Sequence, residues 1–105
     1  MIIKLTKKIF YEDTEYEELN FNLEGLKCFD LFQVEDLGRS LDKENFQLWG
    51  TRHIILLAAR AAGVPFTLIY ELSAKDFMKI QLAIINFFSD IISSASQEES
   101  SDAPF

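Results

Sequence analysis

The sequence holds few side chains that could perform catalysis or bind a metal. It contains one histidine, His53, and one cysteine, Cys28. No serine or cysteine beside His53 forms a recognisable nucleophile arrangement, and a zinc site needs more thiolate or imidazole ligands than this pair supplies. We therefore expect no catalytic residue, no metal and no cofactor, and we interpret His53 as a structural or surface histidine.

Carboxylates and glycines are also arranged without a chemical motif. The acidic runs Glu15–Glu18 and Glu35–Asp36 lack the alternating spacing and central glycine of a calcium loop, and charge runs of this kind are typical of solvated faces. The four glycines are too far apart for a phosphate-binding loop, and no Gly-Lys-Ser/Thr follows any of them. The sequence predicts that the protein is not an enzyme.

Composition narrows the class of protein further. Of 105 residues, 49% are hydrophobic and ten are Phe, which excludes disorder for the body of the chain. The net charge of −7 disfavours nucleic acid and anionic membranes as partners, because both repel an acidic surface. No apolar run is long enough for a membrane span, and Cys28, among apolar neighbours, is expected to be buried in a reducing compartment. We expect a cytoplasmic protein.

Alternating hydrophobicity predicts an antiparallel β-hairpin at the start of the chain. The apolar residues share one parity on each arm, and polar residues take the other: Ile3, Leu5, Ile9 and Tyr11 on the first arm, and Leu19, Phe21 and Leu23 on the second. Because Glu12-Asp13 lacks the glycine that a two-residue turn prefers, we expect a longer loop. A lone hairpin is marginal in water, so helices must cover it.

Helical periodicity begins after Gly25. A short stripe of Leu26, Phe29, Phe32 and Leu37 predicts a first helix that ends near Gly38. A second helix is expected over about 46–62, where Gly63 and Pro65 stop it, and residues 66–72 form a bridging or single helical turn.

The last helix has the clearest start signal in the chain. Ser73 is the expected N-cap, and Asp76 stands three residues further on, as in a capping box. Apolar periodicity continues through Ile92, and residues 93–105 have the composition of a flexible, acidic and Ser-rich tail. The predicted fold is α+β, an N-terminal antiparallel β-hairpin followed by three to four α-helices packed on it, in one domain over residues 1–92.

This last helix is apolar over a wide arc. At 100° per residue, two stripes together span about 220°, whereas a helix on a single core needs little more than 100°. The first stripe holds Phe77, Ile80, Ile84, Phe88 and Ile91; the second holds Met78, Leu82, Ile85 and Ile92, with Phe87 at the far edge. Asp76 falls on the opposite, polar arc. We predict a partner-binding surface made of Met78, Leu82, Ile85, Phe87, Phe88 and Ile92, with core packing of a central helix as the open alternative.

Several segments resemble the tail assembly chaperones of Mu-like, contractile-tailed phages and prophages. The hairpin segments KKIFY (7–11) and YEELNFNL (16–23), the helix stop LAARAAGVP (57–65) and the helix start ELSAKDFMKIQ (71–81) carry the likeness. The resemblance covers roughly residues 5–92. The turn Glu12-Asp13 departs from the Asn-Gly type that would be typical there.

The resemblance implies a non-enzymatic function in the bacterial host cytoplasm. Such proteins bind the tape-measure protein, a long helical chain that sets tail length, and keep it soluble during tail assembly. A longer, frameshifted form in many relatives also engages the tail tube protein, and homo-oligomers are a further expectation. Two alternatives stay open: a self-oligomerising structural phage component, and an acidic inhibitor that mimics DNA.

Overall fold

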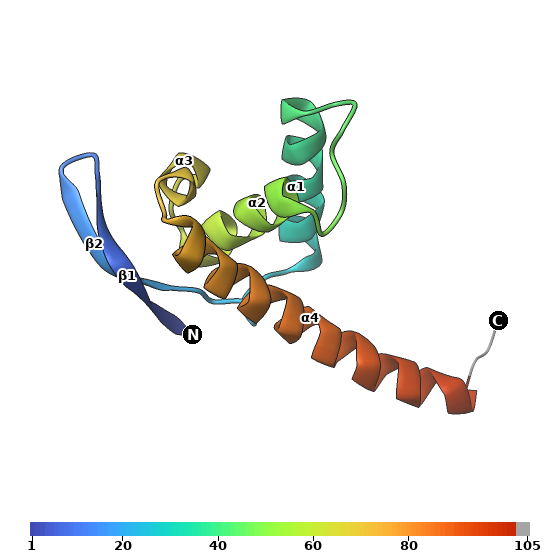
Figure 1. Cartoon of the computed structure of the whole chain (residues 1–105). Helices are drawn as coiled ribbons and strands as arrows, with labels where there is room; N and C mark the ends of the chain where they lie inside the picture. Colours follow the sequence, from blue (N-terminus) through green and yellow to red (C-terminus); the bar gives the residue numbers. More distant parts are fainter. Residues whose placement is uncertain (103–105) are drawn as a thin grey trace.

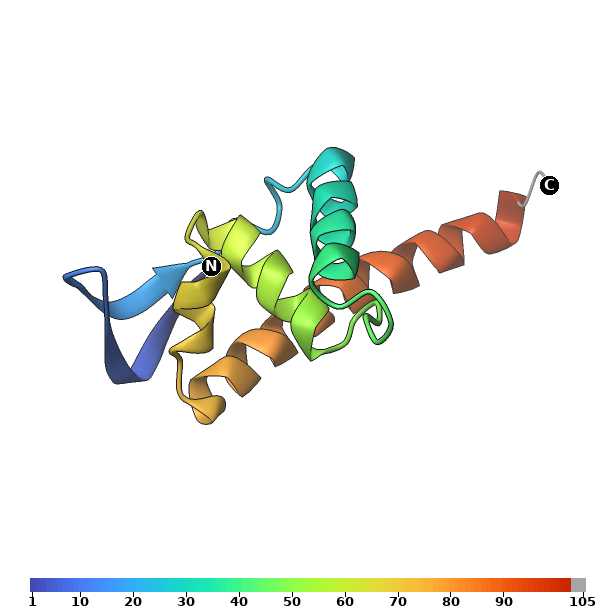
Figure 2. The same ribbon diagram turned by 90° about the horizontal axis from the view of Figure 1, so that it is seen from above.

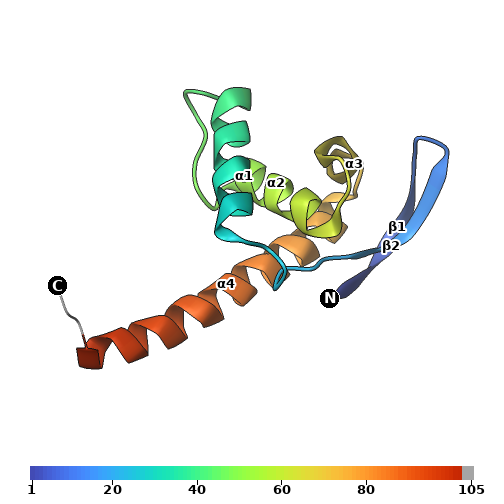
Figure 3. The same cartoon turned by 180° about the vertical axis from the view of Figure 1, so that it is seen from behind.

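The chain folds into an N-terminal β-hairpin followed by four helices, which confirms the predicted α+β arrangement (Figure 1). The computed structural model describes residues 1–102, with side chains described for residues 1–90. The elements in order are β1 (Ile2–Tyr11), β2 (Thr14–Asn20), α1 (Cys28–Leu41), α2 (Thr51–Ala62), α3 (Phe66–Tyr70) and α4 (Ala74–Asp102). The hairpin and the end of α4 project from opposite sides of the helical body, so the molecule measures 53 × 30 × 21 Å (Figures 1 and 3).

The hairpin keeps the predicted alternation but closes differently. Ile9 and Leu19 are buried, whereas their polar neighbours Lys8 and Asn20 are exposed. Tyr11 pairs directly with Thr14, so the connection is a tight two-residue turn and the expected longer loop is wrong. Both turn residues have positive φ, 49° and 64°, the type I′ geometry that matches the twist of a hairpin. An acidic pair therefore adopts a conformation that usually selects Asn-Gly.

β1 carries a bulge in its middle. Lys4 pairs with Glu18 and Ile9 pairs with Tyr16, so residues 5–8 of β1 lie opposite a single residue of β2. The extra residues cannot all pair with β2, and their N–H groups need other acceptors.

The core is built around α2, which contacts α1, α3, α4 and β2. Ile54, Leu57 and Ala58 are fully buried on it. Gly63 ends the helix with φ 68° and donates its N–H to the carbonyl of Arg60, which confirms the predicted C-terminal stop. The helix begins at Thr51, later than the expected start near Phe46.

α1 differs most from the sequence-based expectation. It continues past Gly38 to Leu41, and Gly38 is buried because the Phe46 ring covers it so closely that a Cβ atom at this position would clash with the ring. Of the predicted stripe, Phe29 and Phe32 are 61% and 62% exposed. Cys28, expected to be buried, is exposed at the first position of the helix.

α3 is a single helical turn, as predicted for residues 66–72, and α4 follows it. α4 packs on α2 and β1 near its start and then leaves the body, as the view from above shows (Figure 2). It continues to Asp102, past the end predicted near Ile92. The predicted tail, residues 93–105, therefore overlaps the last part of α4, and residues 103–105 lie outside the described residues. Within residues 1–102 no helix is long and apolar enough to cross a bilayer.

Candidate functional site

The start of α4 is fixed to the hairpin by a buried carboxylate. Ser73 caps the helix, because its Oγ accepts the N–H of Asp76 at 3.2 Å, which confirms the predicted N-cap. The Asp76 side chain is fully buried and reaches into the β1 bulge. Its two oxygens accept the N–H of Thr6 at 2.9 and 3.0 Å, the hydroxyl of Thr6 at 2.9 Å and the N–H of Lys7 at 3.2 Å. The N–H groups of the bulge thus find their acceptor in Asp76, a residue that the helical wheel places on the polar arc of α4.

These hydrogen bonds decide the ionisation of Asp76. Burial penalises the charged form and acts to raise the pKa, but the donors on Thr6, Lys7 and Ser73 outweigh burial and lower the pKa from 3.8 to about 2. The Lys79 ammonium lies 3.5 Å from Oδ1 of Asp76 and also donates to the carbonyl of Lys4 at 3.0 Å. The carboxylate is therefore ionised at neutral pH and holds α4 against β1.

Beyond this anchor, the predicted partner-binding residues fall on different sides of α4. Met78 and Leu82 point to solvent and are 55% and 59% exposed. Ile85, Phe87 and Phe88 are half-buried and pack against the core. Ile92 lies on α4 beyond the residues whose side chains are described. The first stripe supplies the buried contacts, since Ile80 and Ile84 are fully buried.

A groove lies between α4 and the start of α1 together with the segment that leads into it. It has a volume of about 500 Å³ and is lined by Leu23, Glu24, Leu26, Lys27, Cys28, Leu31, Phe87 and Phe88. Five of these eight are Leu or Phe, and the charged pair belongs to the segment that leads into α1. We call this hollow the α1–α4 groove. Its size is that of a small-molecule or side-chain binding site.

A second hollow lies beside Trp49. Trp49, Ile85, Phe88 and Ser89 line a volume of about 190 Å³, and the rings of Trp49 and Phe88 are 5.2 Å apart. Trp49 has a φ of 67°, and its N–H donates to Nδ1 of His53 at 2.8 Å. Burial lowers the pKa of His53, partly opposed by the charge of Glu35. His53 is thus a buried structural residue that fixes the loop before α2, as the sequence analysis predicts.

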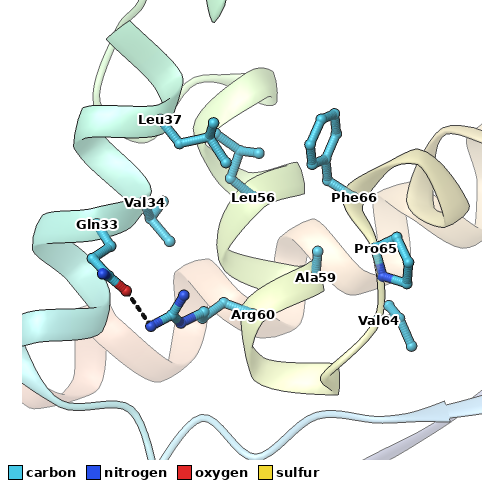
Figure 4. A pocket seen from close by; sticks show the side chains of 9 residues that line it. All are labelled: Gln33, Val34, Leu37, Leu56, Ala59, Arg60, Val64, Pro65 and Phe66. Atoms are coloured by element: carbon cyan, nitrogen blue, oxygen red, sulfur yellow. Dashed lines mark hydrogen bonds between the residues drawn. The ribbon is translucent and has the colours of Figure 1, made fainter. Parts of the chain in front are cut away.

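A third hollow, of about 190 Å³, separates α1 from the hinge between α2 and α3 (Figure 4). Arg60 crosses its floor, where it donates to Gln33 and forms a 2.7 Å ion pair with Asp30. The Asp30 carboxylate also accepts the N–H of Lys27, and this bond is the main reason why the pKa of Asp30 is lowered. Both polar groups at the floor are therefore already engaged in holding α1 on α2.

Among residues 1–90, no group of three or more His, Cys, Asp or Glu side chains could hold a metal ion. Comparison of the chain with protein families, with curated proteins and with solved structures finds no match.

Most of the residues that line these hollows were not predicted from the sequence. Leu31 and Trp49 line the hollows, but neither lies on the last helix, which holds all six predicted partner-binding residues, and only tertiary packing brings them beside α4. The one available signal is the excess of apolar residues in α1, since Phe29, Leu31 and Phe32 are more than this short helix can bury.

Proposed function

We propose that this chain is a tail assembly chaperone of a phage or prophage, a non-enzymatic protein of the bacterial host cytoplasm that keeps the tape-measure protein soluble. The observation that carries the proposal is the α1–α4 groove, an open, largely apolar hollow in a small acidic domain. The hairpin and segments 57–65 and 71–81 resemble tail assembly chaperones, and this resemblance is the reason for proposing the tape-measure protein as the client.

The groove suits a helical client. A helix that lies in a groove inserts apolar side chains spaced at i, i+3 or i+4, and i+7, and a wall of Leu and Phe accepts such anchors. Leu31 on α1 and Phe87 on α4 both line the hollow. The net charge of −7 keeps the complex soluble and favours client segments whose flanks are basic.

The test compares two substitutions on α1. Leu31→Glu places a charge in the groove, whereas Phe29→Glu changes an exposed apolar residue on the same helix that does not line it. Glutamate is compatible with the first turns of a helix, so both variants are expected to fold. Each variant is co-expressed with a tape-measure protein of a contractile-tailed phage or prophage from the same host, and the soluble fraction of this client is measured after centrifugation.

We expect the unchanged chain and Phe29→Glu to keep the client soluble, and Leu31→Glu to lose most of that activity. Circular dichroism of each purified variant establishes that the fold is kept. If both variants protect the client equally, the groove is not the client site. If the unchanged chain gives no protection, the proposed function is wrong.

A further inference from the structure

The loop between α1 and α2 is held to α2 by a neutral histidine. This loop covers residues 42–50, and near its end the backbone N–H of Trp49 donates to Nδ1 of His53 at 2.8 Å. His53 lies in the first turn of α2 and is only 4% exposed. Because Nδ1 accepts a hydrogen bond, it carries no proton, and the imidazole ring is uncharged.

Trp49 depends on this hydrogen bond because its backbone has an unfavourable conformation. Its φ of 67° lies in the left-handed region, which bulky residues rarely adopt. The start of α2 offers no other cap, since the N-cap residue is Gly50, which has no side chain. The ring of Trp49 lies 5.1 Å from that of His53 and 5.2 Å from that of Phe88 on α4. The position of the loop therefore depends on His53 and on the packing of one indole ring.

We propose that His53 is a proton-sensitive latch: when its ring is protonated, the loop is released and the hollow lined by Trp49, Ile85, Phe88 and Ser89 opens. A proton on Nδ1 turns this nitrogen from an acceptor into a donor. Two N–H groups then point at each other, so the hydrogen bond to Trp49 is lost. Without this bond the left-handed backbone of Trp49 is no longer held, and its ring leaves Phe88.

The surroundings of His53 resist a charge on its ring. Burial penalises the imidazolium and lowers the pKa of His53. The first turn of α2 also places the ring at the positive end of the helix dipole. Once the loop is released and water reaches the ring, the pKa returns towards its ordinary value of 6.5. The released form therefore binds the proton more tightly, and acid favours release.

The charged groups of the neighbouring elements oppose this response only weakly. The charge that favours the imidazolium is that of Glu35 on α1, and its carboxylate is paired with Arg39 at 2.9 Å. Asp42 on the loop and Arg52 on α2 pair with each other at 3.8 Å. The other charged residues of the loop are exposed: Lys43 and Glu44. α4 lines the hollow with uncharged side chains only.

The size of the response follows from the difference in proton affinity. The ratio of released to latched chain begins to rise as the pH falls below 6.5, and between pH 7.5 and pH 5 it rises at most about thirtyfold. The pKa of Asp76 is about 2, so the contact between α4 and β1 keeps its charge throughout this range. Release of the loop is thus separated in pH from the loss of that contact.

The latch goes beyond the proposed function and needs no client. Phe88 also lines the α1–α4 groove, so release of Trp49 takes away a packing partner of one groove residue. The test below contains only this chain, and its failure would leave the proposed function untouched.

Hydrogen exchange of backbone amides, followed by NMR, measures how often the loop is released even when release is rare. The exchange rate is divided by the intrinsic rate at each pH, which gives the protection of each N–H. We expect the protection of Trp49 to fall by about ten- to thirtyfold between pH 7.5 and pH 5. Leu57, fully buried in α2, reports unfolding of the whole chain, and its N–H should stay at least about tenfold more protected than that of Trp49.

Two substitutions of His53 decide between the latch and a general effect of pH. The amide oxygen of His53→Asn can accept the Trp49 N–H but does not titrate, so protection should be equal at both pH values. His53→Leu has no acceptor, so protection should be low at both. Protection of Trp49 that does not change with pH in the unchanged chain, or that falls equally in His53→Asn, would overturn the proposal. Equal protection of Trp49 and Leu57 would also overturn it, because the loop would then open only when the whole chain unfolds.

Discussion

The contact between Asp76 and the β1 bulge gives a prediction whose size follows from the structure. Asp76→Asn keeps the shape of the side chain but replaces one carboxylate oxygen by an NH₂ group. That group is a donor facing the N–H groups of Thr6 and Lys7, so hydrogen bonds are lost and buried donors are left unpaired.

The magnitude comes from the shift in pKa. The pKa of Asp76 falls from 3.8 to about 2 on folding, and one pKa unit corresponds to about 1.4 kcal/mol, so the ionised form contributes about 2 kcal/mol. Because the pKa is lower in the folded chain, the unfolded chain binds the proton first as the pH falls. The contribution is fully present above about pH 4 and is lost between about pH 4 and pH 2.

Urea unfolding of the full chain, followed by circular dichroism at several pH values, measures this contribution. At pH 7 we expect Asp76→Asn to lower the free energy of unfolding by about 2 kcal/mol. Between pH 4 and pH 2 the unchanged chain should lose stability more steeply than the variant. Asp90→Asn is the matched control, since Asp90 is an exposed carboxylate on the same helix. A variant as stable as the unchanged chain at pH 7, or one with the same loss below pH 4, would refute this account of Asp76.

Two other features give predictions of similar kind. Replacing Glu12-Asp13 by Asn-Gly, which tolerate positive φ, should stabilise the hairpin by about 1 kcal/mol, measured as a higher urea midpoint; no gain would mean that the turn is unstrained. Burial lowers the pKa of His53, so the unfolded chain takes up a proton first and stability should fall as the pH drops below about 6.5. His53→Asn, which can still accept the Trp49 N–H, should flatten urea stability between pH 7 and pH 5, and an unchanged slope would assign that pH dependence to other groups.

Local signals in the sequence were sufficient to predict the hairpin, the end of α2 and the start of α4. Period-two alternation identified both arms of the hairpin, Gly63 and Pro65 identified the end of α2, and Ser73 identified the start of α4. Each of these depends on residues within one turn or one strand. The end of α1 could not be found in the same way, because Gly38 reads as a helix stop. In the fold it is a buried helical residue whose missing side chain makes room for Phe46.

The candidate surfaces depended on tertiary packing and were predicted only in part. A helical wheel places the exposed Met78 and Leu82 on a different side of α4 from the buried Ile80 and Ile84. It cannot show that Leu31 of α1 lines a groove together with Phe87, or that Trp49 lines a hollow together with Ile85. The six predicted residues therefore belong to more than one surface: Phe87 and Phe88 line the α1–α4 groove, whereas Met78 and Leu82 are exposed on another side of α4.

Asp76 shows why a helical wheel alone does not reveal a buried charge. A carboxylate on the polar arc of a helix is normally solvated, and its burial here is favourable only because the β1 bulge presents donors that β2 cannot satisfy. The bulge leaves N–H groups of β1 without acceptors in β2, and the carboxylate of Asp76 is a charge buried away from water. Each group satisfies the hydrogen-bonding need of the other. This contact fixes the start of α4 against β1, and Phe87 and Phe88 of the α1–α4 groove lie further along the same helix. Asp76→Asn should therefore weaken client protection and lower stability together, whereas Leu31→Glu should weaken client protection alone.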